Sequence, residues 1–323
     1  MDKRRLGATD IEVTPIGLGC WQFSQGGNLS GRAWDPISQE TITAVVEAAM
    51  KGGISWFDTA EVYGRGRSEK NLSAALARLS VKPGSVVVAT KWFPFFRWSH
   101  SIATTIDARI ACLGRYPIDL YQIHQPVSFS PIPAQMKEMV KLLRAGKIRS
   151  IGVSNFSARQ MEEAHAACAE EKIVLASNQV RFNLLDRNIE KSGMLDAAKR
   201  LGITILAYSP LAQGVLTGRF HEDPASIRKL SLIRRIIGGL SPARLARTAP
   251  LIDELRLVAR AHGVTAGQVA LSWAVSFHGA AVVAIAGATK PAQAEQSAGA
   301  MGIRLSQKEL ARIDELSWSV GGK

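Results

Sequence analysis

The chain has 323 residues, of which 46% are hydrophobic and 21% charged, a composition typical of soluble globular proteins. Its three cysteines (Cys20, Cys112 and Cys168) form no CxxC pair and no metal-ligand spacing, which excludes a disulfide scaffold and favours a reducing, cytoplasmic location. The net charge of +13 is spread along the chain, and its densest cluster, residues 228–247, carries no nucleic-acid motif. The most apolar run, residues 280–286, is too short to span a bilayer. We therefore expect neither a nucleic-acid partner nor a membrane, and we interpret the basic residues as a solvated face.

Short apolar runs alternate along the chain with longer stretches of helical periodicity. Each run is apolar almost throughout, as expected of parallel strands that are covered on both faces. The predicted strands are Pro15–Gly19, Ser55–Thr59, Val86–Lys91, Leu120–His124, Ile151–Ser154, Asn178–Phe182, Thr204–Tyr208 and Val282–Ala286.

The stretches between these runs carry the signals of helices. Residues 41–51 place Val45, Val46 and Ala49 at helical spacing, and a similar pattern follows in residues 72–79. Three capping boxes mark expected helix starts, at Ser157 with Gln160, at Thr265 with Gln268, and at Ser306 with Glu309.

Eight strands that alternate with helices permit either a closed barrel or an open doubly wound sheet. An open dinucleotide-binding sheet would carry a G-x-G-x-x-G motif after its first strand, but Gly17-Leu-Gly19 continues as Cys20-Trp21-Gln22. No linker or low-complexity tract divides the chain. The sequence therefore predicts an α/β fold, a (β/α)8 TIM barrel, as a single domain over residues 1–323.

Polar side chains stand where the predicted strands end, which is where barrel enzymes carry their active sites. Asp58, Lys91 and His124 end three consecutive strands. Taken singly, the aspartate could cap a turn, the lysine could extend to the surface, and the histidine could be a hydrogen-bonded core residue. Ionisable groups are costly to bury unless they pair, so we interpret the three together as a site. We expect no metal, because no cluster of ligands has the required spacing.

Tyr63 follows Asp58 by five residues, in the loop after the second predicted strand. A free tyrosine has a pKa of about 10, and an adjacent lysine ammonium would lower it. The aspartate would keep that lysine charged and in place. A tyrosine placed in this way suits proton donation to a carbonyl oxygen, and a neutral His124 would orient the same oxygen.

Seven segments resemble the aldo-keto reductase superfamily, and the match in order and spacing extends from about residue 4 to residue 316. They are Gly17-Leu-Gly-Cys-Trp-Gln22, Phe57-Asp-Thr-Ala-Glu-Val-Tyr-Gly64, Ala89-Thr-Lys91, Gln122-Ile-His-Gln125, Lys147-Ile-Arg-Ser-Ile-Gly-Val-Ser-Asn-Phe156, Ala207-Tyr-Ser-Pro-Leu-Ala-Gln-Gly214 and Ile285-Ala-Gly-Ala-Thr-Lys-Pro291. Residues 176–180 and 211–218 are most similar to bacterial and plant members that include pyridoxal reductases. Residues 4–14 resemble the family's N-terminal β-hairpin, which closes the bottom of the barrel.

The resemblance implies reduction of an aldehyde or ketone to an alcohol with NADPH, by hydride transfer. It assigns a catalytic tetrad of Asp58, Tyr63, Lys91 and His124, in which Tyr63 is the general acid. It also implies binding of the cofactor at the ends of the later strands. The cofactor residues that it implies are Ser154, Asn155, Gln179, Tyr208, Ser209, Leu211, Gly214, Gly287, Thr289, Lys290, Gln293 and Gln296.

Three positions in the implied cofactor site depart from the family pattern. Ser297 stands where many relatives have Asn, Lys290 where many have Arg, and Ala286 where Pro is common. Lysine offers a point charge rather than a bidentate fork to the 2′-phosphate, so strict preference for NADPH is less firmly implied than the cofactor class.

Aromatic residues cluster after the first and third predicted strands, at positions 21, 92, 93, 95, 96 and 98. We expect a ring-shaped or apolar carbonyl substrate, with Trp21 and Trp92 as its contacts. No feature of the sequence fixes the oligomeric state.

Two other functions fit parts of the pattern. A non-catalytic NADPH-binding redox sensor, similar to the β-subunits of potassium channels, would need the cofactor site alone. An aldolase would use Lys91 as a Schiff-base nucleophile, which requires a lowered lysine pKa that the proposed partner Asp58 opposes.

Overall fold

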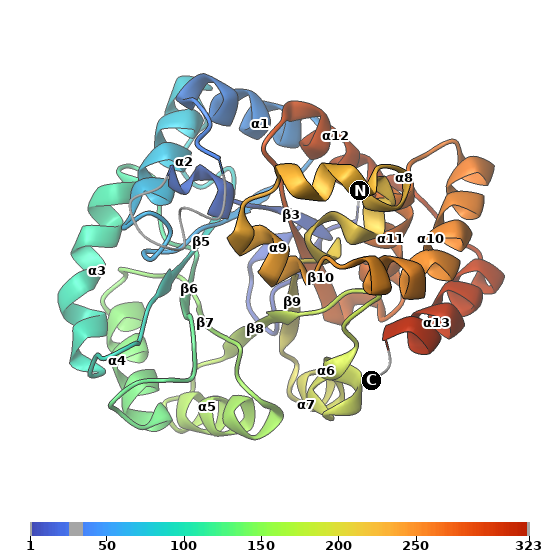
Figure 1. The fold of residues 1–323 in the computed structure, drawn as a ribbon. Helices are drawn as coiled ribbons and strands as arrows, with labels where there is room; N and C mark the ends of the chain where they lie inside the picture. The colour runs from blue at the N-terminus through green and yellow to red at the C-terminus, as the bar shows by residue number, and fades with distance from the viewer. Residues whose placement is uncertain (1, 26–34, 322–323) are drawn as a thin grey trace.

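The computed structural model describes residues 2–25 and 35–321. Eight parallel strands close into a barrel in chain order, because β10 pairs with both β9 and β3 (Figure 1). The barrel strands are β3 (Ile16–Gly19), β4 (Trp56–Asp58), β5 (Val87–Trp92), β6 (Leu120–Ile123), β7 (Ile151–Ser154), β8 (Leu175–Arg181), β9 (Thr204–Tyr208) and β10 (Val282–Gly287). The (β/α)8 barrel expected from the sequence is confirmed.

Helices surround the barrel, as Figure 1 shows. The α-helices are α1 (Gln39–Lys51), α2 (Arg67–Arg78), α3 (His100–Leu113), α4 (Ile132–Arg144), α5 (Ala158–Glu170), α6 (Asn188–Lys191), α7 (Met194–Leu201), α8 (Arg219–Glu222), α9 (Leu232–Gly238), α10 (Pro242–His262), α11 (Ala266–Ser276), α12 (Pro291–Gly299) and α13 (Gln307–Gly321). Short 3-10 helices are η1 (Trp21–Ser24), η3 (Ala212–Thr217), η4 (Pro224–Lys229), η5 (Gly279–Ala281) and η6 (Ala300–Gly302). No described helix is long and apolar enough to cross a bilayer.

The three predicted capping boxes are present. The side chains of Ser157 and Thr265 each accept a hydrogen bond from the backbone amide of a glutamine three residues later. The side chain of that glutamine in turn accepts a bond from the backbone amide of the serine or threonine. Ser306 and Glu309 make the same reciprocal pair before α13. These bonds satisfy amide groups that the first turn of a helix leaves without partners.

The predicted strands differ from the observed ones mainly at β8, which begins at Leu175 rather than at Asn178. The two extra pairs to β7 use Leu175 and Ser177, and the register shifts between them, so that Ala176 has no partner on β7. Gly152 admits this pairing, because a Cβ there would lie 2.5 Å from the Ser177 hydroxyl.

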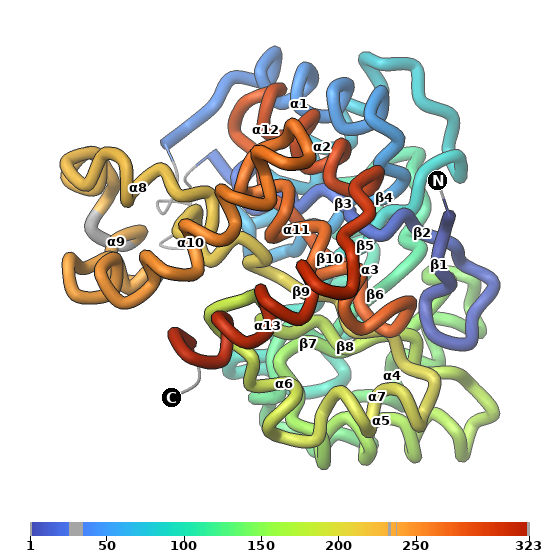
Figure 2. The backbone as a smooth tube through the Cα atoms, turned by 90° about the vertical axis from the view of Figure 1, so that its right-hand side faces the viewer, coloured from blue at the N-terminus to red at the C-terminus, as the bar shows by residue number. Residues whose placement is uncertain are grey.

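An N-terminal hairpin, β1 (Arg4–Arg5) and β2 (Glu12–Val13), closes one end of the barrel. Its Leu6, Ile11 and Val13 pack in one buried cluster with inward-facing residues of the strands, among them Trp56 and Leu206. Figure 2 shows the hairpin at one end of the molecule and the α8–α9 segment at the other. The open end is therefore the end at which the strands finish, as the sequence predicts.

Candidate active site

Asp58 and Lys91 form a buried ion pair just below the open end of the barrel. Both side chains point inward, because residues alternate in β4 and β5 between the barrel interior and the helical layer. The Lys91 ammonium is fully buried and donates to an Asp58 carboxylate oxygen and, at 2.8 Å, to the Thr59 carbonyl. The other Asp58 oxygen accepts bonds from the amides of Gln122 at 3.1 Å and Gln179 at 2.9 Å. This pair therefore has the partners that a buried charge pair requires.

Tyr63 lies above this pair, in the loop between β4 and α2. Its ring centroid is 5.1 Å from the Lys91 ammonium nitrogen. Burial raises the pKa of Tyr63 above its ordinary value, and the nearby Lys91 charge offsets this only in part. Lys91 thus acts on the pKa of this tyrosine in the expected direction, but desolvation is the larger effect and the overall shift is upward. Tyr63 is consequently a protonated phenol at neutral pH.

His124 follows β6 and meets Tyr63 edge to face, with ring centroids 5.6 Å apart. Burial, and then the Lys91 charge, hold the pKa of His124 well below its ordinary value. Its Nδ1 is buried without a hydrogen-bond partner among the described residues. The imidazole is therefore neutral at physiological pH and able to donate or accept one hydrogen bond at the cavity.

The lysine of this site is not placed for Schiff-base chemistry. Burial alone would lower the pKa of Lys91, but the Asp58 charge and the bonds to Asp58 and Tyr63 outweigh burial and raise that pKa. A nucleophilic amine must be unprotonated. The geometry thus opposes the aldolase interpretation.

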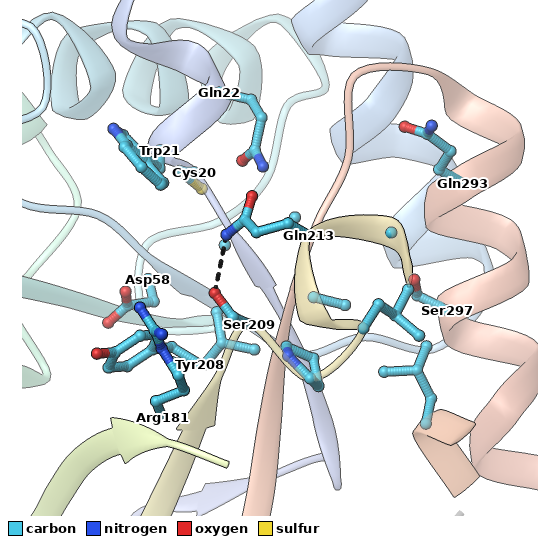
Figure 3. Close-up of a pocket in the computed structure, with 18 of the residues that line it drawn as sticks. Cys20, Trp21, Gln22, Asp58, Arg181, Tyr208, Ser209, Gln213, Gln293 and Ser297 are labelled. Atoms are coloured by element: carbon cyan, nitrogen blue, oxygen red, sulfur yellow. Dashed lines mark hydrogen bonds between the residues drawn. The ribbon is translucent and has the colours of Figure 1, made fainter. Parts of the chain in front are cut away.

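A cavity of about 810 Å³ opens above these residues and extends past the ends of β7 to β10 (Figure 3). Asp58, Tyr63 and His124 line it, whereas Lys91 lies beneath it. Eleven of the twelve expected cofactor residues line it: Ser154, Asn155, Gln179, Tyr208, Ser209, Leu211, Gly214, Gly287, Thr289, Gln293 and Gln296. The exception is Lys290, which is exposed at the N-cap of α12 and does not line the cavity.

Amide and hydroxyl groups gather in the cavity next to the ion pair. Asn155 has a left-handed backbone with φ 62°, and its side chain donates to the Ser154 hydroxyl at 3.0 Å and the His124 carbonyl at 3.1 Å. The Tyr208 hydroxyl in turn donates to Asn155 Oδ1 at 3.0 Å. These bonds fix the side chain of Asn155 against the wall of the cavity, at the point where β7 and β8 end.

The loop after β9 curves tightly over the middle of the cavity. Four of its residues have positive φ, and three of them are not glycine: Ser209 (52°), Ala212 (48°), Gln213 (58°) and Gly214 (95°). The Gln213 side chain donates to the Ser209 hydroxyl at 3.0 Å, as Figure 3 shows. Backbone held in this region is a feature of ligand-binding loops.

Three arginines line the same cavity and were missed by the sequence analysis. Arg219 begins α8, Arg234 lies in α9, and Arg181 ends β8. Burial, and then the Arg219 charge, lower the pKa of Arg234, whereas the Asp35 charge raises it. Arg181 lies two residues after Gln179 and thus on the same strand face, a signal that the sequence contained.

The Gln22 amide lies close against the backbone of Gly287, at the end of β10, and both residues line the cavity. A Cβ on Gly287 would lie 2.2 Å from the Gln22 amide nitrogen, so a larger residue there would displace this side chain. Gln293 accepts bonds from the Thr289 amide at 2.8 Å and hydroxyl at 3.2 Å, which closes the turn between strand and helix. Ser297 completes this end of the cavity.

The two tryptophans expected to contact substrate are placed differently. Trp21 lines the cavity and stacks near the Tyr63 ring, with centroids 6.1 Å apart. Trp92 does not line it; its side chain is fully buried and donates to the Ser101 hydroxyl at 3.1 Å. Because Trp92 follows the inward-facing Lys91, it faces the helical layer, and the next residue, Phe93, reaches the cavity instead.

The chain is similar to proteins of one family along nearly its whole length. A sequence profile of the Aldo/keto reductase family matches residues 15–317. The uncharacterized oxidoreductase Rv2298 of Mycobacterium tuberculosis is 35% identical over 300 residues, which covers 91% of this chain and 86% of that protein. The chloroplastic pyridoxal reductase of Arabidopsis thaliana is 31% identical over 319 residues, which covers 94% of this chain and 83% of that protein.

The fold is likewise similar to solved structures. The glycerol dehydrogenase AKR11B4 from Gluconobacter oxydans matches with a TM-score of 0.82 and 30% sequence identity. The match covers 99% of this chain and 96% of the dehydrogenase, so the likeness extends over the barrel and the segments around its open end.

Proposed function

The chain belongs to the aldo/keto reductase family, a family of oxidoreductases, and on that premise we propose that it reduces an aldehyde or ketone to an alcohol with NADPH. One observation carries this proposal. A protonated tyrosine, a neutral histidine and a lysine fixed by a carboxylate meet at one end of a long cavity. Reduction of a carbonyl needs a proton for the oxygen beside a source of hydride for the carbon, and this end of the cavity offers the proton.

Tyr63 is the proton donor in this proposal. Its phenol O–H bond breaks as the proton passes to the carbonyl oxygen, while the carbonyl carbon receives the hydride that NADPH supplies when bound. The Lys91 ammonium stabilises the phenolate that remains, and Asp58 keeps that ammonium protonated and in position. General acid catalysis of this type contributes roughly 10²- to 10⁴-fold to a rate.

His124 orients the carbonyl oxygen. Its pKa is so low that the ring stays neutral, so it offers a hydrogen bond without competing with Tyr63 as an acid. The bond from the Asn155 side-chain amide to the His124 carbonyl holds the residue between the proton donor and the amide groups of the cavity. Trp21, beside the Tyr63 ring, would contact the substrate.

The cavity fits a nicotinamide dinucleotide along its length. Ser154, Asn155 and Gln179 present polar groups for a carboxamide, and the Tyr208 ring forms a surface on which a flat ring would stack. These groups lie next to Tyr63 and His124, so a ring bound there would be close to the proton donor.

The rest of the cavity suits the phosphates and the adenosine. The loop Ser209–Gly214 would hold the pyrophosphate with Arg219 and Arg234, which line the same part of the cavity. The adenosine would lie along Gly287, Thr289, Gln293 and Gln296. Lys290, exposed at the end of this wall, would extend to the 2′-phosphate and favour NADPH over NADH.

The proposal is tested by following the absorbance of NADPH, and separately of NADH, with 4-nitrobenzaldehyde and with pyridoxal. Pyridoxal is included because one relative is named for its reduction. We expect one alcohol formed for each NADPH oxidised, and slower consumption of NADH. Binding of NADPH without oxidation across a panel of aldehydes and ketones would contradict the reductase.

A further inference from the structure

An unbroken series of aromatic rings extends from the catalytic residues to the surface. The Phe93 ring lines the cavity and meets His124 edge to face, with centroids 5.8 Å apart. Phe95 stacks on Phe93 at 5.6 Å, and Phe96 contacts Phe95 at 5.5 Å. Phe129, from the loop after β6, continues the series at 6.2 Å from Phe96. Trp98 ends it at 5.4 Å from Phe129.

We define Phe93, Phe95, Phe96, Trp98 and Phe129 as the aromatic strip. Its outer members are exposed, by 43% for Phe95, 79% for Phe96, 55% for Trp98 and 52% for Phe129. With Val127, they make up five of the eight large hydrophobic side chains that are exposed in the described parts of the chain. Exposed apolar groups gathered on one surface mark a binding site more often than isolated ones do.

The loops that carry the strip are fixed to each other. The Arg97 carbonyl accepts bonds from the Phe129 amide at 3.1 Å and the Ser128 hydroxyl at 2.9 Å. The Arg97 side chain is held in turn by Glu61 and by Thr105 Oγ1 at 2.8 Å. The exposed rings therefore stand on a braced support, and ordering them on binding costs little entropy.

The backbone at Phe96 adopts a conformation that its side chain disfavours. Its φ is +57°, in the left-handed region that bulky residues rarely occupy. The backbone is therefore locally strained at the most exposed ring of the strip. Strain of this kind is concentrated at ligand-binding sites.

The strip is also nearly free of charge, which limits what it can bind. Residues 93–99 and 125–131 contain one charged side chain, Arg97, and Glu61 neutralises it. On a chain with a net charge of +13, this surface is thus neutral and apolar. An acidic or nucleic-acid ligand would find no counter-charge here, whereas an apolar ligand would find aromatic faces.

We propose that the aromatic strip is an outer substrate subsite, which binds the apolar body of an elongated carbonyl compound while its carbonyl group lies at Tyr63 and His124. The inference rests on the proposed reductase function and deepens it. It is supported by the position of Phe93, which lines the cavity and is also the first ring of the strip, so the two surfaces are continuous. The substrate class is an aromatic aldehyde or ketone that carries a long apolar substituent.

The test compares 4-methyl-, 4-butyl- and 4-octylbenzaldehyde in the NADPH assay. For the native protein, kcat/KM should rise with the length of the substituent. The double variant Phe96→Ala/Phe129→Ala should reduce the ratio of kcat/KM for the octyl and methyl compounds by roughly tenfold, since each aromatic contact contributes a few-fold. Leu257→Ala, at another exposed apolar residue on α10, should leave the ratio unchanged.

Binding provides a second readout that does not depend on turnover. Calorimetric titration of 4-octylbenzyl alcohol into the protein with NADP⁺ should give roughly tenfold weaker binding to the double variant than to the native protein. Equal binding to both would overturn the subsite even if reduction is observed. If the native protein reduces none of the aldehydes but binds the octyl alcohol more tightly than the double variant does, the proposed reductase function is wrong and the proposed apolar site is supported.

The other possible occupant is a second copy of this chain. Sedimentation velocity of the native protein and the double variant distinguishes it. If the double variant dissociates while the length dependence of kcat/KM is retained, the strip is an interface between copies, and the subsite is overturned.

Discussion

The rings of Tyr63 and His124 meet edge to face, with their centroids 5.6 Å apart, and burial shifts their pKa values in opposite directions. The pKa of the phenol is raised and that of the imidazole is lowered, so both side chains are neutral across the physiological range. The proposed proton donor and its neighbour therefore keep distinct roles without a change of charge.

The first prediction concerns the pH dependence of reduction. Reduction requires protonated Tyr63, whose pKa is raised above about 10, so its rate should fall only as pH rises beyond that value. His124 is already neutral at pH 6, so it should add no acid limb. We expect kcat/KM to be flat between about pH 6 and 9. An inflection near pH 6.5 that is absent from His124→Gln would contradict the neutral imidazole.

The second prediction concerns the ion pair of Asp58 with Lys91. Asp58→Asn leaves the buried ammonium without its counter-charge, and loss of one partner of a buried pair costs about 3–5 kcal/mol. We expect urea denaturation to show a decrease of this size in the free energy of unfolding. The control is Glu40→Gln, which removes the exposed pair with Arg78 and should leave the free energy of unfolding nearly unchanged. Equal small decreases in the free energy of unfolding of both variants would show that the buried pair stabilises the fold no more than the exposed pair does.

The third prediction follows from Glu69, which is buried in α2 and accepts bonds from Thr90 at 2.6 Å and Arg109 at 2.8 Å. Burial raises its pKa from 4.5 to about 7. Between these values the folded state binds a proton that the unfolded state releases, so stability falls as pH rises through this range.

The titration of this carboxyl alone should lower the free energy of unfolding of the native protein by up to about 3 kcal/mol between pH 4.5 and 8. Glu69→Gln cannot titrate and should lack this part of the decrease, whereas the exposed Glu47→Gln should retain it. Parallel stability curves for the native protein and Glu69→Gln would contradict the raised pKa.

The fourth prediction concerns Arg219, which lines the cavity beside the loop after β9. Loss of a charge-assisted hydrogen bond costs about 1.5–3 kcal/mol, so Arg219→Ala should weaken cofactor binding at least tenfold. NADPH and NADH should be affected alike, because both carry the pyrophosphate. Arg228→Ala, in η4 and outside the cavity lining, serves as the control for net charge. Equal dissociation constants for the native protein and Arg219→Ala would remove this residue from the cofactor site.

The order of the strands and the polar residues at their ends could be predicted from the sequence, because strand ends meet at one mouth in any parallel barrel. The convergence of Arg219 and Arg234 could not, since it depends on how the segment after β9 folds back over the cavity. The net pKa shift of Tyr63 also required the structure, because the balance of burial against the Lys91 charge depends on solvent exposure.

Trp92 is a different case, since alternation along β5 was sufficient to predict its position. Lys91 faces the interior of the barrel, so its neighbour must face the helices. The many aromatic residues in the loop after β5 made the alternation of inward and outward side chains hard to recognise. Phe93 was among the aromatics noted in the sequence, but its link to the exposed strip depends on the pairing of two loops that are distant in the chain.

In the proposed reaction Tyr63 gives the proton to the carbonyl oxygen, and a comparison of the native protein with Tyr63→Phe tests this role. The assay measures NADPH oxidation with 4-nitrobenzaldehyde, and NADPH binding is measured in parallel by fluorescence titration. We predict a loss of roughly 10²- to 10⁴-fold in kcat with the dissociation constant of NADPH unchanged. Equal rates for the two proteins would contradict the assignment of Tyr63. Tight NADPH binding with no oxidation by the native protein would instead favour a redox sensor.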